Sequence, residues 1–154
     1  MAQQFQQKGK PYYQDRNKEP VNRDVLNNFI KTIEEKNFLD DEILKSSEKL
    51  GEFFFILRIS ITQFRKFFNQ LKILQEKPQS VLKVQLRIIQ SQIAYAIGRS
   101  KASHKPEELM KKEFKEFLDK CIEKIITSGN EKEYSNFMKF FEAVYAYFYY
   151  YSKN

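Results

Sequence analysis

The strongest imbalance of charge in this sequence lies between Ser60 and Lys101. This segment contains eight basic residues and one acidic residue, Glu76. The residues before it carry equal numbers of basic and acidic side chains, as do those after it, so the segment alone accounts for the formal net charge of +7. If it folds compactly, its chemistry favours the binding of phosphate groups. The alternative is a solvated basic helix face without a ligand.

Two helices are expected to position these cations. Ser60 and Gln63 have the spacing of a capping box, which predicts a helix over about 60–77 that stops before a proline. A second helix is predicted over about 79–97, with Gly98 as its left-handed C-terminal cap. On both helices the apolar residues fall on one face and the basic residues on another.

The basic residues on these polar faces are the candidate contacts for a nucleic-acid backbone. On the first helix they share a stripe with Asn69, and on the second with Gln90. Holding phosphates requires no base-specific geometry, so the binding would be independent of nucleotide sequence. We expect the two stripes together to form one surface. The candidate contacts are Arg65, Lys66, Lys72, Lys83, Arg87 and Arg99.

The rest of the chain also shows helical periodicity. Apolar residues at steps of three and four predict helices over about 23–36, 43–57, 106–127 and 131–151. Four Gly and four Pro are too few for the many turns of an all-β protein. The sequence therefore predicts an all-α fold, a compact antiparallel bundle of five to six helices.

The expected domain organisation is simple. Residues 1–21 are polar and predict a flexible arm, and residues 22–154 predict one helical-bundle domain. The polar start is unlike a signal peptide, and no apolar run approaches the roughly 20 residues that span a bilayer. These features predict a soluble cytoplasmic protein.

Residues that could support catalysis or metal binding are scarce. Cys121 is the only cysteine and His104 the only histidine, which excludes an internal disulfide and a zinc site built from Cys and His alone. Cys121 falls on an apolar helix face and is expected to be a buried small hydrophobe. The basic segment lacks the acidic cluster that a metal-dependent nuclease needs. We therefore expect no enzyme activity, cofactor or metal.

Three short segments carry a resemblance to a known family. They are ITQFRKFFN at residues 61–69, AYAIGR at 94–99 and FFEAVYAY at 140–147. In this order, they resemble motifs of the small subunit of type III-A CRISPR–Cas effector complexes, a member of the Csm set. Ile97 departs from the smaller residue expected there and leaves the Gly–Arg pair intact. The motif residues are Gln63, Phe67, Tyr95, Gly98, Phe141, Glu142 and Tyr145.

The resemblance implies a non-catalytic role in antiviral defence. Such subunits form helical bundles that stack as a minor filament beside the subunits holding the guide RNA. The implied partners are RNA, as crRNA–target duplex or single-stranded target, the backbone and large subunits, and further copies of the chain in a filament or dimer. The third motif, with Glu142, is expected to support packing or subunit contact.

Two other functions remain open. The chain could be a purely structural assembly subunit whose surfaces contact only proteins. It could also be a DNA-binding regulator, because the short turn between Arg58 and Ile61 could mimic a helix-turn-helix.

Overall fold

The computed structural model describes residues 22–153, which form the expected all-α bundle. The arm predicted over residues 1–21 lies outside the described residues. The six α-helices of the described part are α2 (Asp24–Ile33), α3 (Asp41–Ile56), α4 (Ile61–Ile73), α5 (Gln79–Ser103), α6 (Lys112–Ser128) and α7 (Glu131–Lys153). Two short 3-10 turns lie in the connections on either side of α5: η1 (Leu74–Glu76) before it and η2 (Pro106–Glu108) after it.

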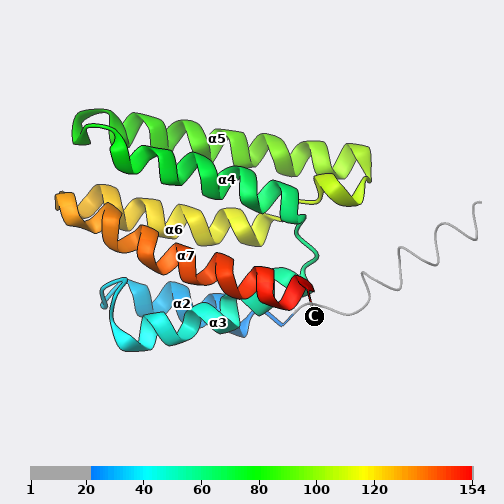
Figure 1. The fold of residues 1–154 in the computed structure, drawn as a ribbon, viewed down its shortest axis with the longest axis horizontal. Coiled ribbons are helices and arrows are strands. Elements are labelled where there is room, and N and C mark those ends of the chain that lie inside the picture. The colour runs from blue at the N-terminus through cyan, green and yellow to red at the C-terminus, as the bar shows by residue number, and fades with distance from the viewer. Residues whose placement is uncertain (1–21, 154) are drawn as a thin grey trace, which may run out of the picture.

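The helices form three layers of two, and consecutive helices run in opposite directions (Figure 1). On one side of the bundle, α7 lies between α3 and α4, and on the other side α6 lies between α2 and α5 (Figure 1). Helices α6 and α7 therefore form the middle layer. Of these two, α7 is the nearer neighbour of α4, and α6 is the nearer neighbour of α5.

Phenylalanine dominates the core that joins the layers. The ring of Phe64 on α4 lies 4.5 Å from that of Phe148 on α7, between centroids, and 4.9 Å from that of Phe114 on α6. Phe54 on α3 approaches the same ring at 6.0 Å in an edge-to-face arrangement. Aromatic pairs with such geometries each contribute about 0.5–1.5 kcal/mol beyond the area they bury. The core thus connects all three layers through one aromatic cluster.

Gly51 allows α3 and α7 to pack unusually closely. A Cβ atom at this position would lie 2.6 Å from the backbone nitrogen of Phe148 and 2.7 Å from Cβ of Tyr147. No other residue type fits there without moving backbone, because only glycine lacks the Cβ atom. The contact between these two helices therefore depends on this residue.

Ser60 caps α4 as the sequence predicts, but the capping box is only half formed. Its Oγ accepts a hydrogen bond from the backbone nitrogen of Gln63 at 3.2 Å. The backbone nitrogen of Ser60 donates instead to the carbonyl oxygen of Leu109, 2.9 Å away. In a complete capping box the Gln63 side chain would accept a hydrogen bond from this backbone nitrogen. Here a segment distant in sequence accepts it and completes the cap.

The predicted end of α5 at Gly98 was wrong. The helix continues to Ser103 and ends at His104, which has the left-handed φ of 58°. The additional turn is anchored because Ser100 is buried and its Oγ accepts a hydrogen bond from the backbone nitrogen of Met110 at 3.2 Å. Gly98 is therefore an exposed residue within the helix, and no glycine turn directs Arg99.

Pro106 begins a 3-10 turn and not the following α-helix, which starts at Lys112. Leu109, which was predicted within that helix, has an extended backbone with ψ of 122°. Its carbonyl oxygen points to α4, where it accepts the hydrogen bond from Ser60. The remaining predicted helices agree with the structure to within a few residues at each end.

Candidate nucleic-acid interface

The structure places the two predicted basic stripes beside different helices. Helix α4 packs against α7 at the front of the bundle in Figure 1, and α5 packs against α6 behind it. Arg65 and Lys72 interact with residues of α7, whereas Arg87 interacts with a residue of α6. The predicted contacts on α4 and on α5 are therefore directed toward different helices of the middle layer, α7 and α6.

Arg65 is held in place by an aromatic pair. Its Nε donates a hydrogen bond to the phenol oxygen of Tyr145 at 3.0 Å. The Tyr145 ring in turn stacks on Phe68 of α4, with centroids 4.6 Å apart and an interplanar angle of 17°. The hydrogen bond to Tyr145 raises the pKa of Arg65. The guanidinium is exposed, permanently charged and fixed in position at the seam between α4 and α7.

Further cations alternate with aromatic rings along this seam. The ammonium nitrogen of Lys72 lies 5.8 Å from the centroid of the Phe68 ring, and that of Lys153 lies 5.5 Å from the Tyr149 ring. Tyr145, Tyr149 and Lys153 follow one another at steps of four, so they share one side of α7. We call this row the α4–α7 track, and its members are Arg65, Phe68, Lys72, Tyr145, Tyr149 and Lys153.

The charge balance of the α4–α7 track is positive. Lys72 lies 3.9 Å from a carboxylate oxygen of Glu142, which is a long and exposed ion pair. Surface pairs of this kind contribute little, so Lys72 can exchange this partner for a phosphate. Lys66 lies beside the track on the outer face of α4, exposed and 5.5 Å from the Phe67 ring. The track therefore contains three cations, and Lys66 beside it adds a fourth. The one acid paired with a track cation among the described residues is Glu142.

Arg87 of α5 is paired with an acid of α6. Arg87 forms an ion pair with Glu123 and a hydrogen bond with Gln90 at 3.0 Å. Gln90 donates to Asp119 at 2.9 Å. The hydrogen bond from Arg87 lowers the pKa of Glu123, and Lys83 acts on the same carboxylate through its charge. These contacts join α5 to α6, and their carboxylates oppose an approaching phosphate.

Arg99 connects α5 to the turn that precedes α6. Its Nε lies 3.3 Å from a carboxylate oxygen of Glu108 in η2. A hydrogen bond with Tyr95 and the interactions with Glu108 raise the pKa of Arg99. Arg99 is therefore engaged by Glu108 at the end of the bundle where η2 meets the start of α4.

The motif residues separate into core and surface positions. Phe67 and Phe141 are fully buried in the core, whereas Gln63 and Tyr145 are partly buried. Tyr95 is 68% exposed. Gly98 and Glu142 are also exposed, so three of the motif residues lie where a partner could reach them.

Sequence reasoning missed three members of the α4–α7 track: Phe68, Tyr149 and Lys153. Helical spacing alone assigns Phe68 to the apolar face of α4, and it places Tyr149 among aromatic residues found on all sides of α7. The signal for the latter was the spacing of Tyr145, Tyr149 and Lys153. That spacing becomes meaningful once α7 is known to lie beside the basic face of α4.

The described residues show little else that resembles a reactive site. Within residues 22–153 no group of three or more His, Cys, Asp or Glu side chains could hold a metal ion. Cys121 is buried, as expected from its place on an apolar face. In the same range no helix is long and apolar enough to cross a membrane.

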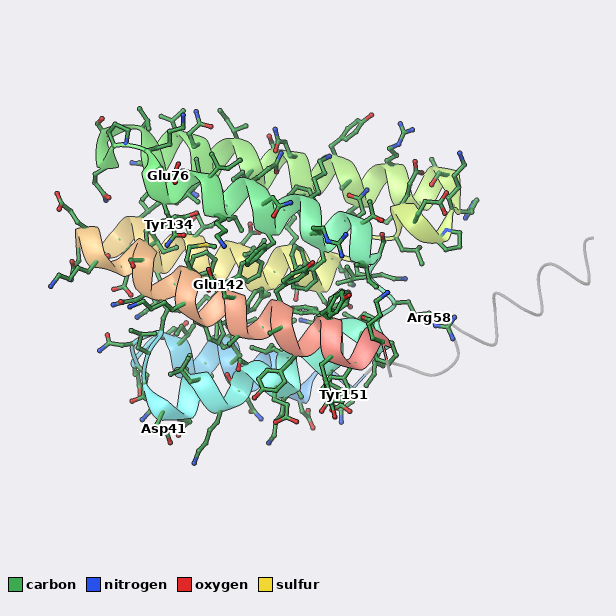
Figure 2. The ribbon with its side chains drawn as sticks, viewed as in Figure 1. Asp41, Arg58, Glu76, Tyr134, Glu142 and Tyr151 are labelled. Atoms are coloured by element: carbon green, nitrogen blue, oxygen red, sulfur yellow. The ribbon has the colours of Figure 1, made fainter. Side chains whose placement is uncertain are left out.

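A hollow of about 490 Å³ lies at the end of the bundle near Arg58 (Figure 2). Its one serine hydroxyl, on Ser152, already donates to the carbonyl oxygen of Phe148 at 2.7 Å. The hollow is lined by Phe55, Ile56, Arg58, Ile59, Ile61 and Ser152.

Comparison with known proteins identifies a family. No curated protein and no solved structure matches the chain. A protein-family model described as Csm2 Type III-A matches residues 39–154, which is most of the sequence and includes α3 to α7. The chain therefore belongs to the Csm2 Type III-A family and is a subunit of the type III-A CRISPR effector complex, in which it associates with other Csm subunits.

Proposed function

We propose that this chain is a non-catalytic RNA-binding subunit that holds the RNA backbone along the α4–α7 track and bridges neighbouring subunits in antiviral defence. Its ligand is the guide–target duplex or the target RNA, bound without sequence specificity. The observation that carries the proposal is the fixed position of Arg65, which Tyr145 and Phe68 hold at an exposed seam.

The composition of the track suits a nucleic-acid backbone. Sequence-independent binding of single strands combines a cationic groove with aromatic faces on which bases can stack. Where guide–target pairing supplies sequence recognition, the protein needs only to hold phosphates. Arg65 and Lys72 supply the charge, and the exposed Tyr149 ring supplies a stacking face.

The cations of the two helices are expected to contribute unequally. Arg65, Lys66 and Lys72 lie in or beside the track, where Glu142 is the one acid of residues 22–153 within ion-pair distance of a track cation. Arg87 and Arg99 already bind Glu123 and Glu108. An RNA phosphate would have to displace these carboxylates, so we assign the main phosphate contacts to α4.

The absence of catalysis is part of the same proposal. It is supported by the lack of a metal-holding group of side chains within the described residues and by the burial of Cys121. The helix-turn-helix alternative is opposed by the fold, because α7 separates α3 from α4 (Figure 1). Consecutive helices of that motif pack directly against each other.

The proposal is tested by the salt dependence of RNA binding. Arg65→Ala with Lys66→Ala should weaken binding and reduce the slope of log K against log salt by about 0.7 per contact for single strands and about 0.9 for a duplex. The matched control is Lys45→Ala with Lys49→Ala, which removes the same charge from exposed positions on α3. Circular dichroism should be unchanged in both. An unaltered affinity and slope in the α4 variant would refute the assignment of the contacts, and undetectable RNA binding by the wild type at low salt would favour a purely structural subunit.

A further inference from the structure

Helix α5 carries an apolar stripe on its outer face that no described residue covers. The exposed fractions of Val84, Ile88 and Tyr95 are 59%, 42% and 68%. Successive members of the stripe are separated by three, four and seven residues, which is the a/d spacing of a helix that packs against another helix. The stripe consists of Val81, Val84, Ile88 and Tyr95. We call it the α5 stripe.

Small residues continue the α5 stripe along the helix. Ser91 lies at the heptad position between Ile88 and Tyr95, and Gly98 lies one step beyond Tyr95. Gly98 is exposed inside a helix, and a Cβ atom there would meet nothing within 4 Å. Glycine is a poor helix former, and the chain's own packing gives no reason for it at this position. A second helix approaching closely from outside would give one.

Cations flank the α5 stripe on both sides. Lys83 and Lys101 are 18 residues apart, five helical turns, so they lie along the same edge. Arg99 lies one turn beyond Tyr95, at the other edge. Lys101 forms no ion pair among the described residues, whereas Lys83 acts through its charge on Glu123 of α6 and Arg99 is paired with Glu108 of η2. Together with Arg87, these edges carry four cations against the two carboxylates of Glu108 and Glu123, so a surplus of positive charge borders the stripe.

This charge pattern selects among the partners that could cover the stripe. A second copy of the chain docked through the same face would bring like charges together, which disfavours that pairing. RNA would leave Val84 and Ile88 without an apolar partner. An amphipathic helix with an apolar stripe between Asp and Glu residues would satisfy both the apolar centre and the cationic edges.

We propose that the α5 stripe is the docking surface for an acidic amphipathic helix of another subunit of the effector complex. This inference rests on the proposed function, in which the chain bridges neighbouring subunits, and it locates the bridging surface on α5. From Val81 to Ala102 the face is about 32 Å long, enough for a helix of about six turns. The α4–α7 track lies on α4 and α7, whereas the stripe lies on α5. The chain can therefore hold RNA and this partner at the same time.

Photo-crosslinking in the assembled complex identifies the occupant. p-Benzoyl-phenylalanine replaces Tyr95, and in a control it replaces Tyr150, which is 56% exposed on α7. The Tyr95 probe should form a crosslink to an Asp- and Glu-flanked helix of a different subunit. Crosslinks only to RNA, only to a second copy of this chain, or to nothing would each overturn the proposal.

Substitutions provide a second test with a separate readout. Val84→Glu with Ile88→Glu places acids on the stripe and should lower incorporation into the complex by about tenfold or more, because buried like charges oppose docking. Both side chains are exposed, so the variant should fold, and its RNA affinity should match the wild type. Tyr150→Glu is the control. Normal incorporation of the double variant would overturn the docking surface without affecting the RNA track.

The charge requirement is tested separately. Lys83→Glu with Lys101→Glu should lower incorporation more than Lys83→Gln with Lys101→Gln, because reversal repels an acidic helix whereas neutralisation only removes attraction. Equal incorporation of the two pairs would contradict an acidic partner.

Discussion

Arg65 on α4 donates a hydrogen bond to the phenol oxygen of Tyr145 on α7, 3.0 Å away and 80 residues later in the sequence. The same tyrosine ring stacks on Phe68, so it fastens both a polar and an apolar side chain of α4. This contact joins two layers of the bundle at its surface. It also presents a permanent positive charge in one orientation, which lowers the entropy that an RNA contact would otherwise cost.

Removal of the Tyr145 hydroxyl tests whether this anchoring matters. Tyr145→Phe keeps the ring on Phe68 but removes the hydrogen-bond acceptor of Arg65. We expect RNA affinity to fall by up to about fivefold, equivalent to the roughly 1 kcal/mol of one hydrogen bond. Fluorescence anisotropy with labelled RNA measures it. Tyr147→Phe on the same helix is the control, and equal affinities of the two variants would show that Arg65 needs no anchor.

Gly51 should be the least replaceable glycine of the described chain. In Gly51→Ala the added Cβ would meet the backbone of α7 at 2.6 Å, so the two helices must separate. We expect a loss of about 1–3 kcal/mol in the free energy of unfolding, as for other overpacked sites. Urea denaturation followed by circular dichroism measures this loss.

The matched control for Gly51 is Gly98→Ala. Alanine at position 98 meets nothing within 4 Å and improves the helix, so a gain of up to about 1 kcal/mol is expected in the isolated chain. If Gly51→Ala proves as stable as the wild type, α3 and α7 do not pack as closely as described.

Tyr134 should control stability at alkaline pH. Its hydroxyl donates to the carbonyl oxygen of Leu71 at 2.5 Å, and burial raises its pKa far above the ordinary value of 10.0. The folded state retains a proton that the unfolded chain loses near pH 10. The free energy of unfolding should therefore fall above that pH, by up to about 1.4 kcal/mol per pH unit for this group.

Tyr134→Phe tests this dependence. At neutral pH the variant should lose about 1 kcal/mol with the hydrogen bond, but between pH 10 and roughly 11.5 its stability should decline less steeply than that of the wild type. Urea titrations across this pH range give the slopes. Tyr150→Phe, an exposed site, serves as the comparison. Parallel slopes for Tyr134→Phe and the wild type would mean that Tyr134 is solvated.

Cys121 should react only when the bundle opens. Its side chain is fully buried, and burial raises the pKa of the thiol well above its ordinary value, against the weaker opposing effect of Lys124. A thiol reagent such as DTNB needs an accessible thiolate, so we expect labelling in urea at least about 100-fold faster than in buffer. Ser128→Cys, on the exposed end of α6, provides the accessible reference. Immediate labelling of native Cys121 would contradict the packing around α6.

Much of the fold could be predicted from local patterns. Apolar spacing located the helices, and Ser60 marked the start of α4 because its side chain accepts from a backbone nitrogen three residues later. The errors were at contacts between distant segments. Gly98 appeared to end α5, but Ser100 anchors a further turn to Met110. Leu109 appeared helical, but its carbonyl oxygen completes the cap of α4.

The site was less predictable than the fold for the same reason. Periodicity separated the basic face of each helix from its apolar face, yet it could not show which neighbour each basic face would meet. Glu123 pairs with Arg87 only because α6 lies beside α5, and Tyr145 reaches Arg65 only because α7 lies beside α4. Gly51 carried no local signal, since its importance comes from the backbone of another helix.

The most direct measurement is the mapping of RNA crosslinks in the assembled complex. Target RNA containing 4-thiouridine is irradiated, and the crosslinked peptides of this chain are identified by mass spectrometry. The proposed function predicts crosslinks at the rings of the α4–α7 track, on Phe68, Tyr145 or Tyr149. Crosslinks confined to the α5–α6 side, around Lys83 and Arg87, or an absence of crosslinks on the track would contradict it.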